Sequence, residues 1–210
     1  MLTVHHLGVS QSERIVWLCE ELSVPYQLQR YDRDPVTRLA PPELKALHPF
    51  GAAPVITDGT LVLAESAAII EYVIARYGKG RLAVPPDAPN YADYLFWFHF
   101  ANGSMMPVQF AGAIKPSPDE SPRTRVMRER CERSWRMVED RLGAVPYFAG
   151  REFTAADIIM LFVLTTMRAF VPRDIAPFPN VREYLQRIGA RPAYRRAMQK
   201  GDPQMTPLLA

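Results

Sequence analysis

The sequence predicts an α+β domain followed by an all-α helical bundle. Residues 1–78 combine short apolar, β-prone runs with amphipathic segments, and almost everything after residue 89 follows helical spacing. Between them lies a stretch rich in Gly and Pro, which suits a short, stiff connection. We therefore expect domains at residues 1–79 and 89–210, joined by a linker at residues 80–88.

The first domain begins with a strand and a helix. Residues 2–6 are apolar and β-prone, and the apolar residues from Ile15 to Leu22 then recur at helical spacing. Ser10 and Glu13 form an S-x-x-E pattern, which predicts a capping box at the start of this helix.

The remaining strands and helices of this domain complete a recognisable order of secondary-structure elements. We expect a strand at residues 26–31, a short helix near residues 43–47, a hairpin around the Asp-Gly pair within residues 54–63, and a helix from Ser66 to Gly78. The order strand, helix, strand, helix, strand, strand, helix is that of a thioredoxin-like fold.

The second domain is expected to contain only helices. Thr154 and Asp157 predict a capping box, and residues 158–164 are apolar on all sides, which is typical of a helix buried in a bundle. The expected helices are residues 91–113, interrupted near Pro107, and residues 122–142, 154–170, 181–188 and 193–200.

The composition excludes several function classes. The formal net charge is only +3 and the basic residues are scattered, which argues against nucleic-acid binding. No apolar run reaches the roughly 20 residues of a membrane span, and the first residues lack the pattern of a signal peptide, so we expect a cytoplasmic protein. Cys19 and Cys131 are isolated, so we expect two buried thiols, no disulfide and no metal site.

Several separated motifs agree in order with one family. They are residues 10–14 (Ser-Gln-Ser-Glu-Arg), residues 48–56 around Pro54, the pair Glu65-Ser66, and the cap at residues 153–157. Together they resemble the cytosolic glutathione S-transferases over nearly the whole chain, in particular the bacterial and fungal branch with serine or cysteine at the first turn. The resemblance implies a homodimeric detoxification enzyme that uses glutathione as co-substrate, without a metal. It would join glutathione to small apolar electrophiles or reduce peroxides with it.

Such a site must stabilise a thiolate, because a free thiol has a pKa of roughly 8.5 and is mostly protonated at neutral pH. The resemblance assigns the hydroxyl donor to Ser10, at a helix amino end that also favours an anion. Ser12 is the alternative donor, and either serine could instead only cap the helix. Classes that use tyrosine carry it where this chain has His5 and His6.

The resemblance also implies glutathione contacts. Ala53-Pro54 matches a cis peptide bond, after which the main chain of Val55 would pair with the cysteinyl part of glutathione. Glu65 and Ser66 would hold the γ-glutamyl end. Without the family, these residues could be an ordinary strand start and an ordinary helix start.

One position departs from the family pattern. Family members often carry lysine after the glycine of the turn, whereas this chain has Ala52. The glycyl carboxylate of glutathione therefore needs another partner, for which His48 and Lys45 are the candidates.

The candidate electrophile pocket lies on the long helix after the linker. We expect His99, Asn102 and Met106 to line it, with Pro107 kinking the helix. A transferase-like module that binds a partner without catalysis is the alternative function, because folds are reused.

Overall fold

The computed structural model describes residues 1–113, 117 and 120–210, and divides into two compact units. The first contains Met1–Ala83 and Ala190–Pro207, and the second contains Val84–Gly189 and Leu208–Ala210. The expected all-α domain ran to residue 210, whereas residues 190–207 pack with the first unit. The first unit is therefore discontinuous in sequence.

The first unit is a four-stranded sheet with helices. Its sheet has the order β2-β1-β3-β4, in which β1 is parallel to β2 and antiparallel to β3, and β3 and β4 form the predicted hairpin. This is the predicted thioredoxin-like arrangement. The elements are β1 (Leu2–Leu7), α1 (Glu13–Leu22), β2 (Gln27–Tyr31), α2 (Pro42–Lys45), β3 (Val55–Asp58), β4 (Leu61–Ala64), α3 (Ser66–Arg76) and α9 (Pro192–Gly201).

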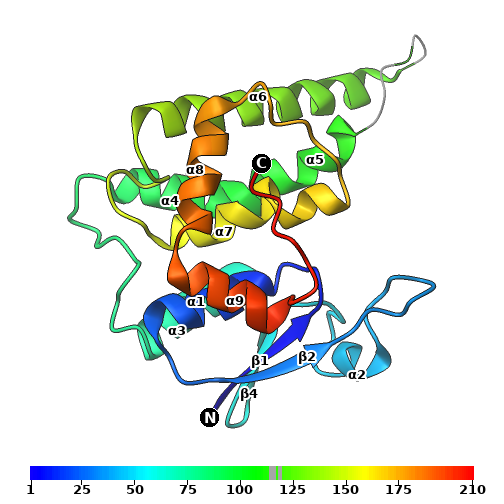
Figure 1. Cartoon of the computed structure of the whole chain (residues 1–210), viewed down its shortest axis with the longest axis vertical. Coiled ribbons are helices and arrows are strands. Elements are labelled where there is room, and N and C mark those ends of the chain that lie inside the picture. The colour runs from blue at the N-terminus through cyan, green and yellow to red at the C-terminus, as the bar shows by residue number, and fades with distance from the viewer. Residues whose placement is uncertain (114–116, 118–119) are drawn as a thin grey trace. The chain divides into compact units, whose positions relative to one another are not determined.

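Helix α1 is buried almost all round because both α3 and α9 pack against it (Figure 1). Trp17 of α1 meets Tyr194 of α9 edge to face, with ring centroids 5.2 Å apart. The carboxylate of Glu20 in α1 forms ion pairs with Arg196 at 2.9 Å and with Lys200 at 2.5 Å, both from α9. Apolar contact and ion pairing therefore hold α9 in place on α1.

The second unit is helical, as predicted. One irregular turn, a π-helix, interrupts the first long helical run at Ala101–Met105. Pro107, which we expected to kink the helix, has no N–H to donate to the carbonyl of Gly103, four residues earlier. The regular hydrogen-bond pattern therefore breaks in the turn just before the proline, where the π-helix lies. The elements are α4 (Tyr91–Phe100), α5 (Met106–Gly112), α6 (Pro122–Ala144), α7 (Ala155–Leu164), a 3-10 turn (Thr166–Ala169) and α8 (Pro179–Gly189).

Helix α7 is the core of this unit, and all of its residues are buried, as predicted. The predicted capping box is present: Ala156 N–H donates to Thr154 Oγ1 at 3.3 Å, and Thr154 N–H donates to Asp157 Oδ2 at 2.9 Å. Asp157 also accepts the N–H of Phe148 and the hydroxyl of Tyr184. One buried carboxylate therefore joins the start of α7, the preceding loop and α8.

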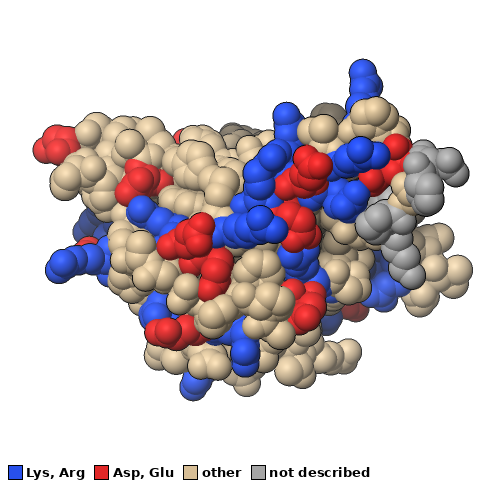
Figure 2. All heavy atoms as spheres, turned by 90° about the horizontal axis from the view of Figure 1, so that it is seen from above, with Lys and Arg blue, Asp and Glu red and all other residues tan. Residues whose placement is uncertain are grey.

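The basic residues of α6 lie among acidic ones. Figure 2 shows Lys and Arg interspersed with Asp and Glu on the face in view. Arg128 pairs with Glu120 at 2.6 Å, and Glu132 pairs with Arg173 at 2.5 Å. This face therefore lacks a single-sign field of the kind that attracts nucleic acid. Within the described part of the chain, no helix has the length and apolar character needed to cross a membrane.

Candidate active site

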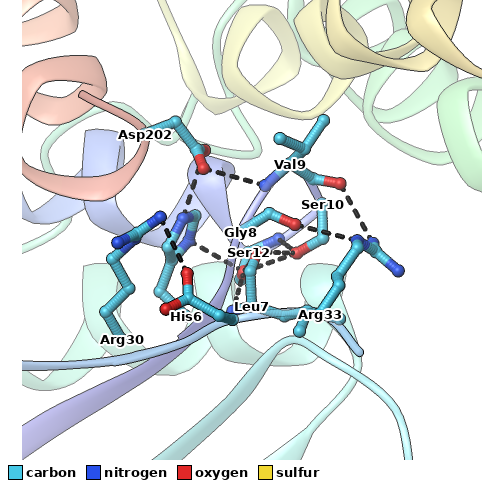
Figure 3. Close-up of polar contacts among 10 residues, drawn as sticks. His6, Leu7, Gly8, Val9, Ser10, Ser12, Arg30, Arg33 and Asp202 are labelled. Carbon is cyan, nitrogen blue, oxygen red and sulfur yellow. Dashed lines mark hydrogen bonds and ion pairs between the residues drawn. The ribbon is translucent and has the colours of Figure 1, made fainter. Parts of the chain in front are cut away.

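The turn between β1 and α1 is held by hydrogen bonds to its main chain (Figure 3). Gly8 N–H donates to Tyr31 O at 2.9 Å, and Val9 N–H donates to Asp202 Oδ1 at 2.8 Å. Arg33 donates to the carbonyls of Gly8 and Val9 at 2.9 and 3.0 Å. Val9 has φ of +53°, which is rare for a β-branched residue, so these bonds hold a strained turn in place.

The predicted capping box of Ser10 and Glu13 is wrong. Helix α1 begins at Glu13 with Ser12 as its N-cap residue, and no side chain caps it. Ser10 Oγ instead donates to Leu7 O at 2.7 Å and accepts the N–H of Ser12 at 3.2 Å. Ser10 lies two residues before the N-cap, so its hydroxyl organises the turn rather than the helix end.

The two serines of the turn differ in access. Their hydroxyl oxygens are 2.7 Å apart. Ser12 is completely enclosed, and its Oγ contacts His6 Nδ1 at 2.9 Å and accepts the N–H of Leu7 at 3.1 Å. Ser10 retains 7% of its exposed surface. Of the two candidate donors, Ser10 is thus the less enclosed.

The two histidines of β1 face different partners. His5 contacts the hydroxyls of Tyr31 at 3.0 Å and Thr57 at 3.2 Å, and burial lowers its pKa. His6 is fully buried and contacts Asp202 Oδ2 at 3.1 Å on the side opposite Ser12. Sequence reasoning did not identify Asp202, because it lies almost the whole chain away and belongs to no recognisable motif.

The peptide bond between Ala53 and Pro54 is cis, as predicted. Val55 follows it as the first residue of β3, where it is fully buried and in register with His5 on β1 and Ala64 on β4. The cis peptide bond of Ala53 and Pro54 thus lies directly before the first residue of β3. The contact of Val55 with glutathione stays a prediction.

Glu65 and Ser66 lie where α3 begins. Glu65 is the N-cap residue, with φ of +76° and no side-chain cap, and its carboxylate is exposed. A non-glycine residue at this φ is strained, which is typical of functional positions. Ser66 is buried at the first turn of this 11-residue helix, where unpaired N–H groups and the helix dipole favour an anion.

Arg14 is a site residue that the sequence interpretation did not single out. It is buried, and its Nη1 donates to Gln11 Oε1 at 2.7 Å and to Ser66 Oγ at 3.4 Å. Burial lowers the pKa of Arg14 to about 9, while the charges of Glu13 and Glu65 act to raise it. A buried guanidinium thus joins the first turn of α1 to the start of α3. The signal that could have identified Arg14 is a charged residue among the apolar positions of α1.

The candidates for the glycyl carboxylate lie in the loop before β3. His48 is half-buried, and its Nδ1 accepts the N–H of Phe50 at 3.2 Å, which leaves the ring hydrogen on Nε2. Lys45 is exposed at the end of α2, and Ala52 is half-buried. His48 therefore offers Nε2 as a donor, and Lys45 offers its exposed amino group.

The candidate electrophile residues lie in the second unit. His99 is the penultimate residue of α4, Asn102 lies in the π-helix and Met106 begins α5, so the three follow one another along the same helical run. Asn102 Oδ1 is buried and has no hydrogen-bond partner among the described residues. A pocket of about 390 Å³ between this run and α6 is lined by other residues, among them Phe100, Pro107 and Met137.

The thiols of the chain are not reactive groups. Cys19 and Cys131 are free and buried, as predicted, and burial together with Glu20 raises the pKa of Cys19 to about 12. Burial also raises the pKa of Cys131. The described residues contain no cluster of side chains suited to a metal ion.

A thioredoxin-like unit with a cis-proline turn and a polar helix start, followed by a helical bundle, defines the glutathione transferase class of proteins. The family model "Glutathione S-transferase, N-terminal domain" matches residues 10–76, and "Glutathione S-transferase, C-terminal domain" matches residues 120–187. The chain belongs to the glutathione S-transferase family, which confirms the resemblance.

Relatives support this family over the full length. Glutathione S-transferase 3 of Schizosaccharomyces pombe is 32% identical over 100% of this chain and 92% of its own. Glutathione S-transferase 1 of Saccharomyces cerevisiae is 27% identical over 95% of both chains. A crystal structure of a glutathione S-transferase from Actinobacillus pleuropneumoniae is 34% identical, covers 100% of this chain and 99% of its own, and has a TM-score of 0.86.

Proposed function

We propose that this chain joins the thiolate of glutathione to electrophilic carbons of small apolar molecules, with Ser10 as the hydroxyl donor to the thiolate. The observation that carries the proposal is the hydrogen bond from Arg14 to Ser66, which brings the start of α3 to the first turn of α1, next to Ser10. The two segments come from separate motifs, and each supplies groups suited to an anion.

The chemistry of Ser10 follows from its place in the turn. A hydroxyl donor that meets a sulfur anion stabilises it relative to the thiol and so lowers the thiol pKa. The amino end of α1 adds partial positive charge. The hydroxyl of Ser10 donates to Leu7 O at 2.7 Å. Rotation about one bond would redirect it to a bound thiolate.

The rest of glutathione is assigned to three segments. The main chain from Ala53 to Val55 would pair with the cysteinyl part. Ser66 and the amino end of α3 would hold the γ-glutamyl carboxylate, and Glu65 the ammonium group. For the glycyl carboxylate we assign His48, whose Nε2–H is available as a donor.

We assign the electrophile to His99, Asn102 and Met106. Asn102 Oδ1 finds no donor in the part of the chain that the structure describes, and this supports the assignment, because a buried acceptor without a donor favours a ligand that supplies one. Met106 supplies an adaptable apolar surface.

The proposed setting is a cytoplasmic, detoxifying homodimer. Two free, buried cysteines suit a reducing compartment. Exposed apolar side chains support dimerisation, among them Phe96 of α4, Phe110 of α5 and Met137 of α6.

A non-catalytic, transferase-like module is not favoured. The full-length relatives are named as transferases, and Ser10, Pro54, Glu65 and Ser66 are all present. Only Ala52 departs from the family pattern that we expected.

The test compares Ser10→Ala with Ser12→Ala. We expect Ser10→Ala to bind glutathione nearly as well as wild type, to conjugate an aryl halide up to about 10²-fold more slowly, and to show a rate midpoint shifted to higher pH. A larger loss in Ser12→Ala would transfer the role to Ser12. An unchanged rate and pH midpoint in both variants would end the proposal of serine activation.

A further inference from the structure

A buried chain of polar groups runs from the end of α9 to the turn before α1 (Figure 3). Asp202 Oδ2 lies 3.1 Å from His6 Nε2, and His6 Nδ1 lies 2.9 Å from Ser12 Oγ. Ser12 Oγ lies 2.7 Å from Ser10 Oγ, which lies 2.7 Å from Leu7 O. None of the four side chains is more than 7% exposed, so water does not compete for these bonds.

The two ends of this chain are acceptors. The carbonyl of Leu7 only accepts, and so does the carboxylate of Asp202 when ionised. Burial acts to raise the pKa of Asp202, but the hydrogen bond and charge of His6 and the N–H of Val9 hold it below its usual value. Asp202 is therefore ionised at neutral pH.

The number of hydrogens that these contacts require distinguishes a neutral imidazole from an imidazolium at His6. The Leu7 N–H bond to Ser12 Oγ supplies its own hydrogen. Four further contacts of 3.1 Å or shorter link Asp202, His6, Ser12, Ser10 and Leu7 O, and each needs one hydrogen. The two hydroxyls supply two. A neutral imidazole supplies one more, which leaves one contact between two acceptors, whereas an imidazolium supplies two.

We propose that His6 carries a hydrogen on both ring nitrogens and forms an ion pair with the Asp202 carboxylate. This pair orients the hydroxyl hydrogens of Ser12 and Ser10 away from His6, so that Ser10 is the last donor in the series. His6 Nδ1–H then donates to Ser12, and the Ser12 hydroxyl donates to Ser10. The Ser10 hydrogen rests on Leu7 O and turns to the thiolate when glutathione binds. This last step rests on the proposed function.

The outward direction matters because hydrogen bonds in series polarise one another. A hydroxyl that accepts from a donor becomes a better donor itself, by about 10–30% per bond. With His6 at the inner end, Ser12 passes this effect to Ser10. His6 and Asp202 are thus positioning residues that act through Ser10 and do not touch the sulfur.

The packing around His6 suits this role. A Cβ on Gly201 would lie 3.1 Å from His6 Nε2, so the ring occupies the space that a side chain at Gly201 would need. Glu20 binds Arg196 and Lys200 of α9 and so fixes the helix that carries Gly201 and leads into Asp202. The imidazole therefore has little freedom to leave the carboxylate.

Three other titratable groups surround the pair. The charge of Arg30 on β2 also lowers the pKa of Asp202, and Asp202 in turn acts on Arg33 and on Tyr194 of α9. Arg30 and Arg33 are cations and favour the ionised carboxylate. The guanidinium of Arg33 donates to the carbonyls of Gly8, Val9 and Arg38.

The first test measures the hydrogens directly and needs no glutathione. Nitrogen-15 NMR of histidine-labelled protein distinguishes protonated from bare ring nitrogens, and His6→Gln identifies the signals of His6 among the four histidines. We expect both nitrogens of His6 to be protonated at neutral pH. A bare Nδ1 or a bare Nε2 would overturn the proposal, whatever the activity of the protein.

The second test separates the two sides of the ring by measuring the pH midpoint of the bound glutathione thiol from thiolate absorbance. The amide of asparagine reaches the place of Nδ1, so His6→Asn keeps a donor to Ser12. The amide of glutamine reaches the place of Nε2, so His6→Gln keeps only the contact with Asp202. We expect His6→Gln to raise the midpoint by about 0.5–1 unit, which is about three- to tenfold less thiolate at a pH well below the midpoint, and His6→Asn to raise it less.

The matched control is His5→Gln. It changes the neighbouring imidazole of β1 but none of the hydrogen-bonded groups that link Asp202 to Ser10, so it should leave the midpoint of the glutathione thiol unchanged. A wild-type midpoint in folded, glutathione-binding His6→Gln would refute the link to Ser10. Wild-type protein that fails to bind glutathione would instead remove the proposed function and leave the NMR result standing. If both His6 variants fail to fold, replacing the other three histidines, His5, His48 and His99, one at a time identifies the His6 signals by elimination, and the NMR measurement still decides the protonation state.

Discussion

Replacing Asp157 with alanine should destabilise the second unit more than any other loss of a capping residue. The carboxylate is completely buried and accepts Thr154 N–H at 2.9 Å, Phe148 N–H at 3.0 Å and the Tyr184 hydroxyl at 3.2 Å. Asp157→Ala leaves two main-chain donors and one phenol without an acceptor.

The magnitude follows from these three groups. An unsatisfied buried polar group costs about 1–3 kcal/mol, and partial relaxation reduces the sum, so we expect a loss of roughly 3–5 kcal/mol in the free energy of unfolding. This is a large share of the ~5–15 kcal/mol typical of a domain. Thr154→Ala is the matched control, because it removes the other half of the capping box and should cost only about 1 kcal/mol.

Urea unfolding followed by tryptophan fluorescence measures this difference. Trp97 and Trp135 are buried in the second unit and report on its unfolding. The reasoning requires the midpoint of Asp157→Ala to fall well below that of Thr154→Ala at similar slope. Equal midpoints for the two variants would show that the links from Asp157 to Phe148 and Tyr184 contribute nothing measurable.

Three further predictions concern the binding site, α9 and assembly. Glu65→Ala and Ser66→Ala should each weaken glutathione binding by roughly 1–3 kcal/mol without unfolding the chain, and calorimetry showing wild-type affinity in both would reject the γ-glutamyl site. Burial acts to raise the pKa of Glu20, but hydrogen bonds from Lys200, Arg196 and Tyr26 lower it below its usual value. The stabilisation of α9 by Glu20 is therefore present above the unfolded pKa of about 4.3, and it is lost as the pH falls through the lower pKa of the folded protein. The protection of α9 amides against hydrogen exchange, relative to the unfolded chain at the same pH, should therefore fall below about pH 4 in wild type and at neutral pH in Glu20→Gln, and wild-type protection in that variant would contradict the role of these ion pairs. Light scattering should give twice the 23.8 kDa chain mass, and a monomer at micromolar concentration would count against the dimer.

Local sequence patterns predicted most of the fold because the interactions behind them are local. The Asp58-Gly59 pair indicated the hairpin, and Thr154 with Asp157 indicated the start of α7. The same logic failed at Ser10, where an S-x-x-E pattern matched a capping box. There, two other partners of the hydroxyl, Leu7 O and Ser12, were stronger than the cap.

The parts of the site that the sequence did not reveal depend on distant contacts. Asp202 meets His6 only because α9 returns to α1, and no spacing rule connects positions so far apart. Arg14 occupies one position in an apolar helix, and its role depends on Ser66 coming close. The π-helix at Ala101–Met105 depends on a proline two residues beyond it, which indicated an interruption but not its form.

The discontinuous first unit has a consequence for the order in which the chain is made. Met1–Ala83 leave the ribosome first, but α9 follows only after all of Val84–Gly189 has been synthesised, on the order of 5–20 s later. During that interval the side of Trp17 that Tyr194 will cover has no partner from α9, and His6 has no carboxylate. The first unit to emerge is thus completed only after Val84–Gly189 of the second unit has been made, and a nascent chain halted before Ala190 carries both serines of the turn without the residue that would orient them.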